Sequence, residues 1–258
     1  MQRTISHASS TDVSRSATGL RWEVWLLRAV LAASATYAVF RGEKSGLAAP
    51  LVALALTWAP ALIGARGGLR APRVIETLWA LALTIPAASD ALGLYERVMY
   101  WGKLVHGIEG GLVAGIAALL LVGYADRAEL GLPRQLAALA AVCVGITAGV
   151  VWEFVEFVID WVRSGDLQKS NADTMTDLLW SNLGALGAAV LAIRVYHHVL
   201  DDRARTSVGA FGDCLFTPIG HFLDRHGKLA FLLMVLLIAA SIAGLWFTGR
   251  PVPGLLFE

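Results

Sequence analysis

The chain has 258 residues, of which 57% are hydrophobic and only 16% are charged, and its mean hydropathy is +0.63. This composition is typical of an integral membrane protein and leaves no soluble domain of useful size. The chain has 21 Lys and Arg residues and 20 Asp and Glu residues, so no overall basicity points to a nucleic-acid partner. Cys143 and Cys214 stand in no metal-ligand spacing, so we expect two free thiols.

Seven apolar segments follow a polar start. Residues 1–19 are rich in Ser and Thr and lack apolar periodicity, which predicts a disordered cytoplasmic tail. Each apolar segment has the length that about 30 Å of hydrocarbon requires at about 1.5 Å per residue. The expected spans are residues 20–40, 47–65, 74–93, 104–123, 135–162, 174–195 and 229–247. The sequence therefore predicts an all-α fold, a polytopic transmembrane helix bundle of about seven spans.

The charged residues between the spans predict the orientation of the chain. With the N-terminus inside, the cytoplasmic loops hold more Lys and Arg than the loops on the other side, as the positive-inside rule requires. We therefore expect a multi-pass protein of the bacterial inner membrane with a cytoplasmic N-terminus. The longest loop, residues 196–228, is then cytoplasmic. Within it, Thr217 can cap a short amphipathic helix from Pro218 to Gly227, which we expect to lie along the membrane surface.

Acidic and histidine side chains interrupt three of the apolar segments near ends that meet on the outer side in this topology. An ionisable group at mid-bilayer costs roughly 2.5 to 3.5 kcal/mol, so such groups normally face a protein interior or a wet cavity. Helical spacing places the members of each set on one face of their helix. The sets are His106 and Glu109 in the fourth span, Glu153, Glu156 and Asp160 in the fifth, and Asp173 and Asp177 in the sixth. We expect His106, Glu153 and Glu156 to share one pocket.

Two kinds of chemistry fit these side chains. Carboxylates and one imidazole are a ligand set for Mg, Mn, Fe or Zn, which makes a divalent metal a possible cofactor. The candidate metal ligands are His106, Glu109, Glu153, Glu156 and Asp173. Acid–base catalysis without a metal is the other kind, since clustered acids raise one another's proton affinity. The candidate catalytic residues are His106, Glu153, Glu156 and Asp177.

Five motifs around these residues resemble the YjdF-like family of bacterial membrane proteins. In chain order they are Asp90-Ala-Leu-Gly-Leu-Tyr95-Glu96-Arg97, Trp101-Gly-Lys103-Leu-Val-His106, Trp152-Glu153-Phe-Val-Glu156-Phe, Asp173-Thr174-Met-Thr-Asp177-Leu and Gly184-Ala-Leu-Gly187. A looser likeness extends to VanZ-like proteins. The resemblance implies a six-span transmembrane core, residues 20–195, with residues 229–258 as an additional C-terminal span. It supplies a fold and a site but no reaction.

Three classes of function stay open from the sequence. The first is a metal-assisted or acid–base enzyme that acts on a lipid or lipid-linked substrate near the outer leaflet. The second is an ion- or proton-coupled transporter, in which the same carboxylates bind a cation or relay protons. The third is a non-catalytic membrane scaffold or resistance-type protein with a structural polar lattice. Membrane lipids are the expected partners in every class, and the sequence leaves the oligomeric state open.

Overall fold

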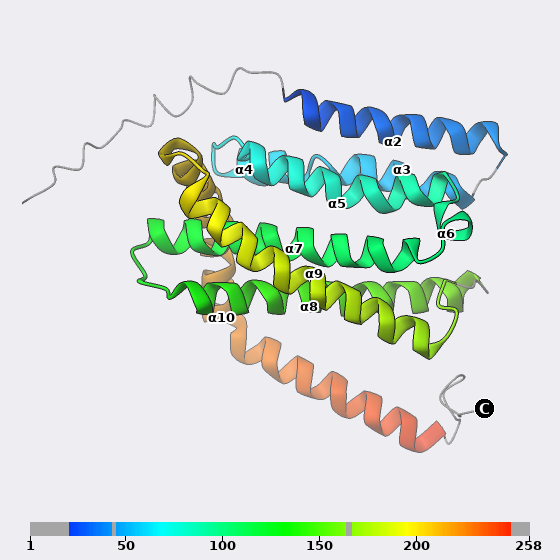
Figure 1. Cartoon of the computed structure of the whole chain (residues 1–258). Coiled ribbons are helices and arrows are strands. Elements are labelled where there is room, and N and C mark those ends of the chain that lie inside the picture. The colour runs from blue at the N-terminus through cyan, green and yellow to red at the C-terminus, as the bar shows by residue number, and fades with distance from the viewer. Residues whose placement is uncertain (1–20, 43–44, 164–166, 249–258) are drawn as a thin grey trace, which may run out of the picture. The chain divides into compact units, whose positions relative to one another are not determined.

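A computed structural model describes residues 21–42, 45–163 and 167–248 of the chain. Every regular element in these ranges is a helix, which confirms the all-α fold class (Figure 1). The tail that the sequence predicts to be disordered, residues 1–19, lies outside the described residues. The chain forms two compact units, residues 1–214 and 215–258, and all residues of the candidate site belong to the first.

Six helical segments among the described residues are long and apolar enough to cross a membrane. In Figure 1 they are α2 (Trp22–Phe40), α3 (Ser45–Leu56) together with α4 (Ala59–Arg66), α5 (Arg73–Ala91), α7 (Trp101–Arg127), α8 (Arg134–Arg163) and α9 (Asn171–His198). Six of the seven predicted spans thus have a matching helix. The seventh, residues 229–247, includes side chains outside the described ones, and it stays a prediction.

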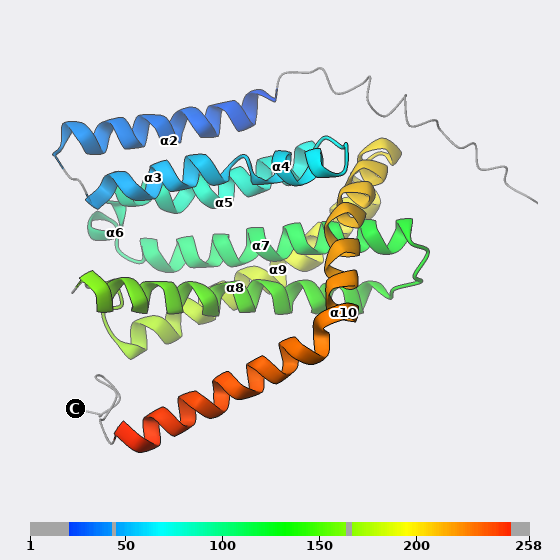
Figure 2. The same cartoon turned by 180° about the vertical axis from the view of Figure 1, so that it is seen from behind.

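The six spans run up and down, so alternate connections meet at the same end of the first unit (Figures 1 and 2). One end holds the start of α2 and the turns that join α4 to α5 and α7 to α8. At the other end α5 and α8 finish and α7 and α9 begin, with the short helix α6 (Leu94–Arg97) between α5 and α7. We call this second end the site end, because the polar residues singled out above lie near it.

The second span is broken, whereas the sequence predicted one continuous segment over residues 47–65. α3 ends at Leu56 and α4 begins two residues after Thr57. Pro60 has no N–H to donate to the carbonyl of Leu56. That carbonyl instead accepts a hydrogen bond from Nε1 of Trp79 in α5, at 2.8 Å. The proline therefore accounts for the break, and a neighbouring helix satisfies the carbonyl that the break leaves free.

The most extensive helix packing joins α7 to α9. A Cβ atom added to Gly184 of α9 would clash with the backbone of Gly107 on α7, and one added to Gly110 would clash with the backbone of Ser181. Small residues let membrane helices approach at backbone distance in this way. A Cβ atom added to Gly187, on another face of α9, would meet nothing within 4 Å. The close approach is thus confined to one face of α9.

The chain after α9 departs most from the sequence-based expectation. A short turn follows α9, and α10 (Asp202–Thr248) begins at once, so residues 202–228 are helical throughout and not only from Pro218 to Gly227; the cytoplasmic position of this segment stays a prediction. Asp201 starts the helix by accepting a hydrogen bond at 2.7 Å from the backbone N–H three residues on. Pro218 lies inside α10 and does not begin a separate helix. A proline removes one backbone hydrogen bond, but a helix continues through it when its remaining hydrogen bonds and packing contacts stabilise it.

Candidate functional site

Three side chains from three different helices converge near the site end. His106 comes from α7, Glu153 from α8 and Asp177 from α9, and one potential ligand atom of each lies within 4.8 Å of the others. His106 Nδ1 lies 4.0 Å from Glu153 Oε1, and His106 Nε2 lies 3.7 Å from Asp177 Oδ1. The three residues are 9%, 6% and 6% exposed, respectively. The imidazole therefore presents one nitrogen to each of two buried carboxylates. We call these three residues the triad.

Backbone packing explains why these groups meet. His106 and Asp177 both lie in the second turn of their helices, which begin at the same end and run parallel. Ser181, one turn after Asp177, donates from Oγ to the backbone carbonyl of His106 at 3.2 Å. The contact between Gly107 and Gly184 brings the two backbones together at the same level. The glycines and the serine thus set the rotation of α7 against α9 that aligns the two side chains.

Two carboxylate oxygens of the triad are buried and accept no hydrogen bond from the described part of the chain: Glu153 Oε1 and Asp177 Oδ1. They are the same oxygens that face the His106 ring, at separations too long for direct hydrogen bonds. Buried polar atoms normally have a partner, because an unsatisfied one costs about 1 to 3 kcal/mol. Glu153 Oε1 is therefore available to a ligand beside the imidazole, and Asp177 Oδ1 has a nearby cation, Lys103, but no hydrogen bond.

Lys103 balances part of the negative charge. Its Nζ donates to Asp177 Oδ2 at 3.0 Å and forms a short ion pair with Asp173. Nζ also lies 3.0 Å from Asp177 Oδ1, but without hydrogen-bond geometry. Asp173, which the sequence predicted as a metal ligand, is thus engaged by the lysine and lies outside the triad. Lys103 stands one turn before His106 on the same helix face and belongs to the motif Trp101-Gly-Lys103-Leu-Val-His106 that the sequence analysis singled out.

Glu109 and Glu156 form a second acidic layer beside the triad. Each lies one turn along its helix from a triad residue, and the two carboxylates interact electrostatically. Glu156 also accepts a hydrogen bond at 2.8 Å from Nε1 of Trp152. The sequence predicted both glutamates as metal ligands, and the structure places them next to the triad rather than in it.

Tyr95, on the short helix α6, approaches the acidic layer from outside the spans. Burial and the nearby Glu109 carboxylate raise the pKa of the Tyr95 phenol above its usual range. The sequence analysis placed Tyr95 in a family motif but gave it no role. Its neighbourhood depends on how α6 folds back over the site end, which no local pattern predicts.

Gln168 is a further residue of the site that the sequence analysis missed. Its Nε2 donates to Glu153 Oε2 at 3.2 Å and to the Glu153 backbone carbonyl at 3.0 Å. The adjoining backbone is held by Asp160, whose carboxylate accepts the N–H groups of Leu167 and Gln168 at 2.9 and 2.8 Å. A single glutamine in a polar connection carries no pattern that could have predicted this contact.

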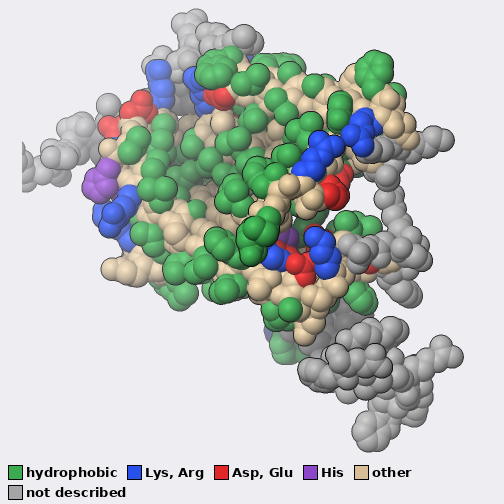
Figure 3. Space-filling view, turned by 45° about the vertical axis from the view of Figure 1, so that its right-hand side comes forward, with side chains coloured by type: hydrophobic (Ala, Val, Ile, Leu, Met, Phe, Trp, Pro, Cys, Tyr) green, Lys and Arg blue, Asp and Glu red, His purple; other side chains and the backbone are tan. Residues whose placement is uncertain are grey.

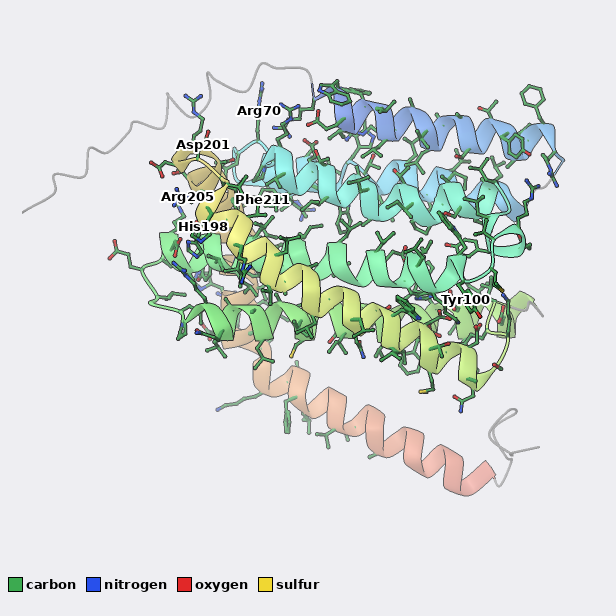
Figure 4. The ribbon with its side chains drawn as sticks, in the orientation of Figure 1. Arg70, Tyr100, His198, Asp201, Arg205 and Phe211 are labelled. Atoms are coloured by element: carbon green, nitrogen blue, oxygen red, sulfur yellow. The ribbon has the colours of Figure 1, made fainter. Side chains whose placement is uncertain are left out.

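Two further views show the site end of the first unit. In Figure 3, acidic and basic side chains with a histidine behind them border a hollow on a face that is otherwise largely hydrophobic. Tyr100, which immediately precedes α7, marks the site end in Figure 4, whereas Arg70 and His198 lie at the opposite end of the first unit. His106 and Asp177 lie in the second turns of α7 and α9, so the triad is near this end of the spans and not midway along them.

Fold and site together define a class of protein: an all-α integral membrane protein with a buried cluster of histidine and carboxylate side chains. The chain belongs to the family described as "Predicted membrane protein (DUF2238)", whose model matches residues 23–198. An uncharacterized protein of Thermotoga maritima is 31% identical over 104 residues, which is 40% of this chain and 53% of that protein. The match thus spans about half the length of that relative. No solved structure matches the chain.

Proposed function

We propose that this protein binds a divalent metal ion through His106, Glu153 and Asp177 and uses it in metal-assisted or acid–base catalysis on a lipid or lipid-linked substrate. The observation that carries the proposal is the pair of buried triad oxygens without a hydrogen-bond donor among the described residues. Both face the imidazole, and a cation bound beside that ring would compensate for the missing donors.

The charge around the triad favours a cation over an anion. Three carboxyl groups, those of Glu153, Asp173 and Asp177, lie close to one lysine, Lys103, so acidic side chains outnumber basic ones by two. A divalent ion balances this excess, whereas an anion would add to it. The same excess argues against a site that binds a free phosphate without a metal.

The three triad residues must move closer together to share one metal ion. Ligand atoms bound at about 2.1 Å from a metal lie about 3.0 to 3.4 Å apart, whereas one ligand atom of each triad residue lies within 4.8 Å of the others. Three protein ligands leave coordination positions open, as in catalytic sites and unlike closed structural ones. Carboxylate and imidazole ligands suit Mg, Mn, Fe or Zn.

The substrate class follows from the position of the site in the spans. A cluster near the helix ends lies near the depth of lipid headgroups, and the faces around it are hydrophobic (Figure 3). The positive-inside rule assigns this end to the outer leaflet. The motifs given above support assignment to the YjdF-like proteins. A single Cys at Lys169, in protein lacking Cys143 and Cys214, should react with a membrane-impermeant maleimide in intact cells, and labelling only after lysis would move the site to the inner leaflet.

A transporter is the second candidate, and the broken second span is the observation that favours it. Discontinuous helices supply the binding sites of many secondary transporters. Here the side chain of Arg28 donates to both oxygens of Thr57 at the break, so the break already holds a cation of the protein. In the triad, Glu153 Oε1 and Asp177 Oδ1 accept no hydrogen bond from the described residues, so the triad supports a bound ion more directly.

Elemental analysis of the detergent-purified protein tests the proposal. We expect about one divalent metal per chain after incubation with Mn²⁺ or Zn²⁺ and gel filtration, and its loss in Glu153→Gln and His106→Gln. Glu156→Gln is the matched comparison, since it removes an acid one turn from Glu153 and outside the triad, and it should retain the metal. Wild-type protein that binds neither ion would reject the proposal and favour a structural polar lattice. Metal flux into proteoliposomes would favour the transporter.

A further inference from the structure

Gln168, which lies just before α9, contacts the triad directly. The Asp160 carboxylate, in the last turns of α8, accepts the backbone N–H groups of Leu167 and Gln168. Ser170 then caps α9 by accepting the N–H of Asp173 at 3.1 Å. Between these two anchors, the Gln168 side chain extends back to Glu153, fifteen positions earlier in the sequence. The contact between Gln168 and Glu153 therefore depends on tertiary structure. Hydrogen bonds of Asp160 and Ser170 hold the backbone on either side of it.

The two oxygens of Glu153 have different surroundings because of Gln168. Oε2 accepts a hydrogen bond from the Gln168 amide at 3.2 Å. Oε1 has no donor among the described residues and faces His106 Nδ1. The amide also donates to the Glu153 backbone carbonyl, so the Gln168 side chain binds both the carboxylate and the backbone of Glu153. Only a group with two N–H donors on one nitrogen can make this pair of contacts.

We propose that Gln168 is a positioning residue for the metal site: it fixes the Glu153 side chain so that Oε1 alone points to the metal, and Asp160 holds the connection that carries it. This inference rests on the metal site proposed above. Hydrogen-bond partners of a ligand orient it, and their loss typically lowers metal affinity about 10- to 100-fold. Without Gln168 the carboxylate is free to rotate or to bind through both oxygens.

Metal titration of the Gln168 variants tests the positioning role. We expect Gln168→Ala to bind Mn²⁺ about 10- to 100-fold more weakly than wild type, with the stoichiometry unchanged. Gln168→Glu should be affected at least as much, because it cannot donate to Glu153. Asp160→Ala should weaken binding in the same direction by releasing the connection. Leu167→Ala is the control, since it keeps the backbone N–H that Asp160 accepts, and it should bind as wild type does.

The electron paramagnetic resonance spectrum of bound Mn²⁺ supplies a readout that a merely structural role would not change. We expect a changed zero-field splitting in Gln168→Ala and an unchanged one in Leu167→Ala, because only the first alters how Glu153 binds. Identical affinity and spectrum in Gln168→Ala and wild type would overturn the positioning role while leaving the metal site intact. Absence of Mn²⁺ binding in wild-type protein would instead count against the proposed function.

A second measurement tests the contact in metal-free protein. A hydrophobic carbodiimide modifies carboxyl groups inside membrane proteins, and mass spectrometry can locate the product at Glu153. We expect faster modification of Glu153 in Gln168→Ala than in wild type or Leu167→Ala, because Oε2 loses its hydrogen-bond donor and becomes more accessible to the reagent. Equal rates in all three proteins would show that Gln168 does not hold Glu153, whatever the metal results.

Discussion

Arg28 donates from Nε to the hydroxyl of Thr57 at 3.0 Å, at the point where the second span breaks. Its Nη2 donates to the Thr57 carbonyl oxygen at 3.3 Å, and its guanidinium carbon lies 3.6 Å from the ring centroid of Trp58. Arg28 is only 6% exposed within an apolar helix, where a charge is costly unless it is paired. The break in the second span therefore supplies partners for the buried arginine of the first span.

Replacing this arginine should destabilise the protein. Arg28→Met removes both donors and leaves the hydroxyl and carbonyl oxygens of Thr57 without them, which should cost about 1 to 3 kcal/mol of unfolding free energy. Arg28→Lys should recover part of that loss, since an ammonium cannot reproduce the planar fork of a guanidinium. Unfolding in detergent, followed by circular dichroism, measures the effect. Arg66→Met, at an exposed position, is the control, and equal stability of Arg28→Met and the control would contradict the prediction.

The contact between α7 and α9 should tolerate no side chain at Gly184. Gly184→Ala places a methyl group against the backbone of Gly107, which cannot rotate away, so the helices must separate. Overpacking of this kind costs about 1 to 3 kcal/mol. Because the same contact aligns His106 with Asp177, bound Mn²⁺ should also decrease. Gly187→Ala, where a Cβ meets nothing within 4 Å, should keep both stability and metal, and a similar loss in the two variants would argue against this packing.

Removing Lys103 should lower the stability of the metal-free protein and increase the rise of its melting temperature on addition of Mn²⁺. In Lys103→Met the carboxylates of Asp173 and Asp177 lose their shared cation, so the metal-free protein should lose about 1 to 3 kcal/mol. A bound divalent ion then stabilises the folded state by mass action, so added Mn²⁺ should raise the melting temperature more than in wild type. Paired thermal unfolding with and without Mn²⁺ measures both effects. A rise of melting temperature with Mn²⁺ no larger than that of wild type would show that the charge of Lys103 does not weaken metal binding.

The raised pKa of Tyr95 predicts how stability changes in alkali. An unfolded tyrosine ionises at about pH 10. Folded Tyr95 keeps its proton to higher pH, because burial and the Glu109 carboxylate raise its pKa. The stabilisation is therefore complete below about pH 10 and is lost as the pH rises beyond it. Tyr95→Phe should flatten the fall of melting temperature between about pH 9.5 and 11. Tyr100→Phe, at an exposed position, should retain the wild-type slope, and equal slopes in both variants would refute the assignment.

The sequence by itself determined the membrane class, the six helices with spanning length and the residues from which the site is drawn. These conclusions depend on local quantities: apolar runs of spanning length, and ionisable groups placed where hydrocarbon makes them costly. His106, Glu153 and Asp177 could be singled out because a charge in an apolar helix needs a partner. The same reasoning singled out Glu109, Glu156 and Asp173, since it reports that a residue needs a partner but not which partner it finds.

Only the tertiary structure decided which of these side chains meet. Glu109 and Glu156 lie one turn from triad residues, and what excludes them from the triad is the rotation of α7, α8 and α9 about their axes. That rotation follows from backbone contacts such as Gly107 with Gly184, which involve residues far apart in the chain. Gln168 reaches Glu153 because Asp160 holds the backbone N–H groups of Leu167 and Gln168, and no periodicity encodes such a contact. Local energetics therefore selects the polar residues, and the geometry of helix packing assigns their partners.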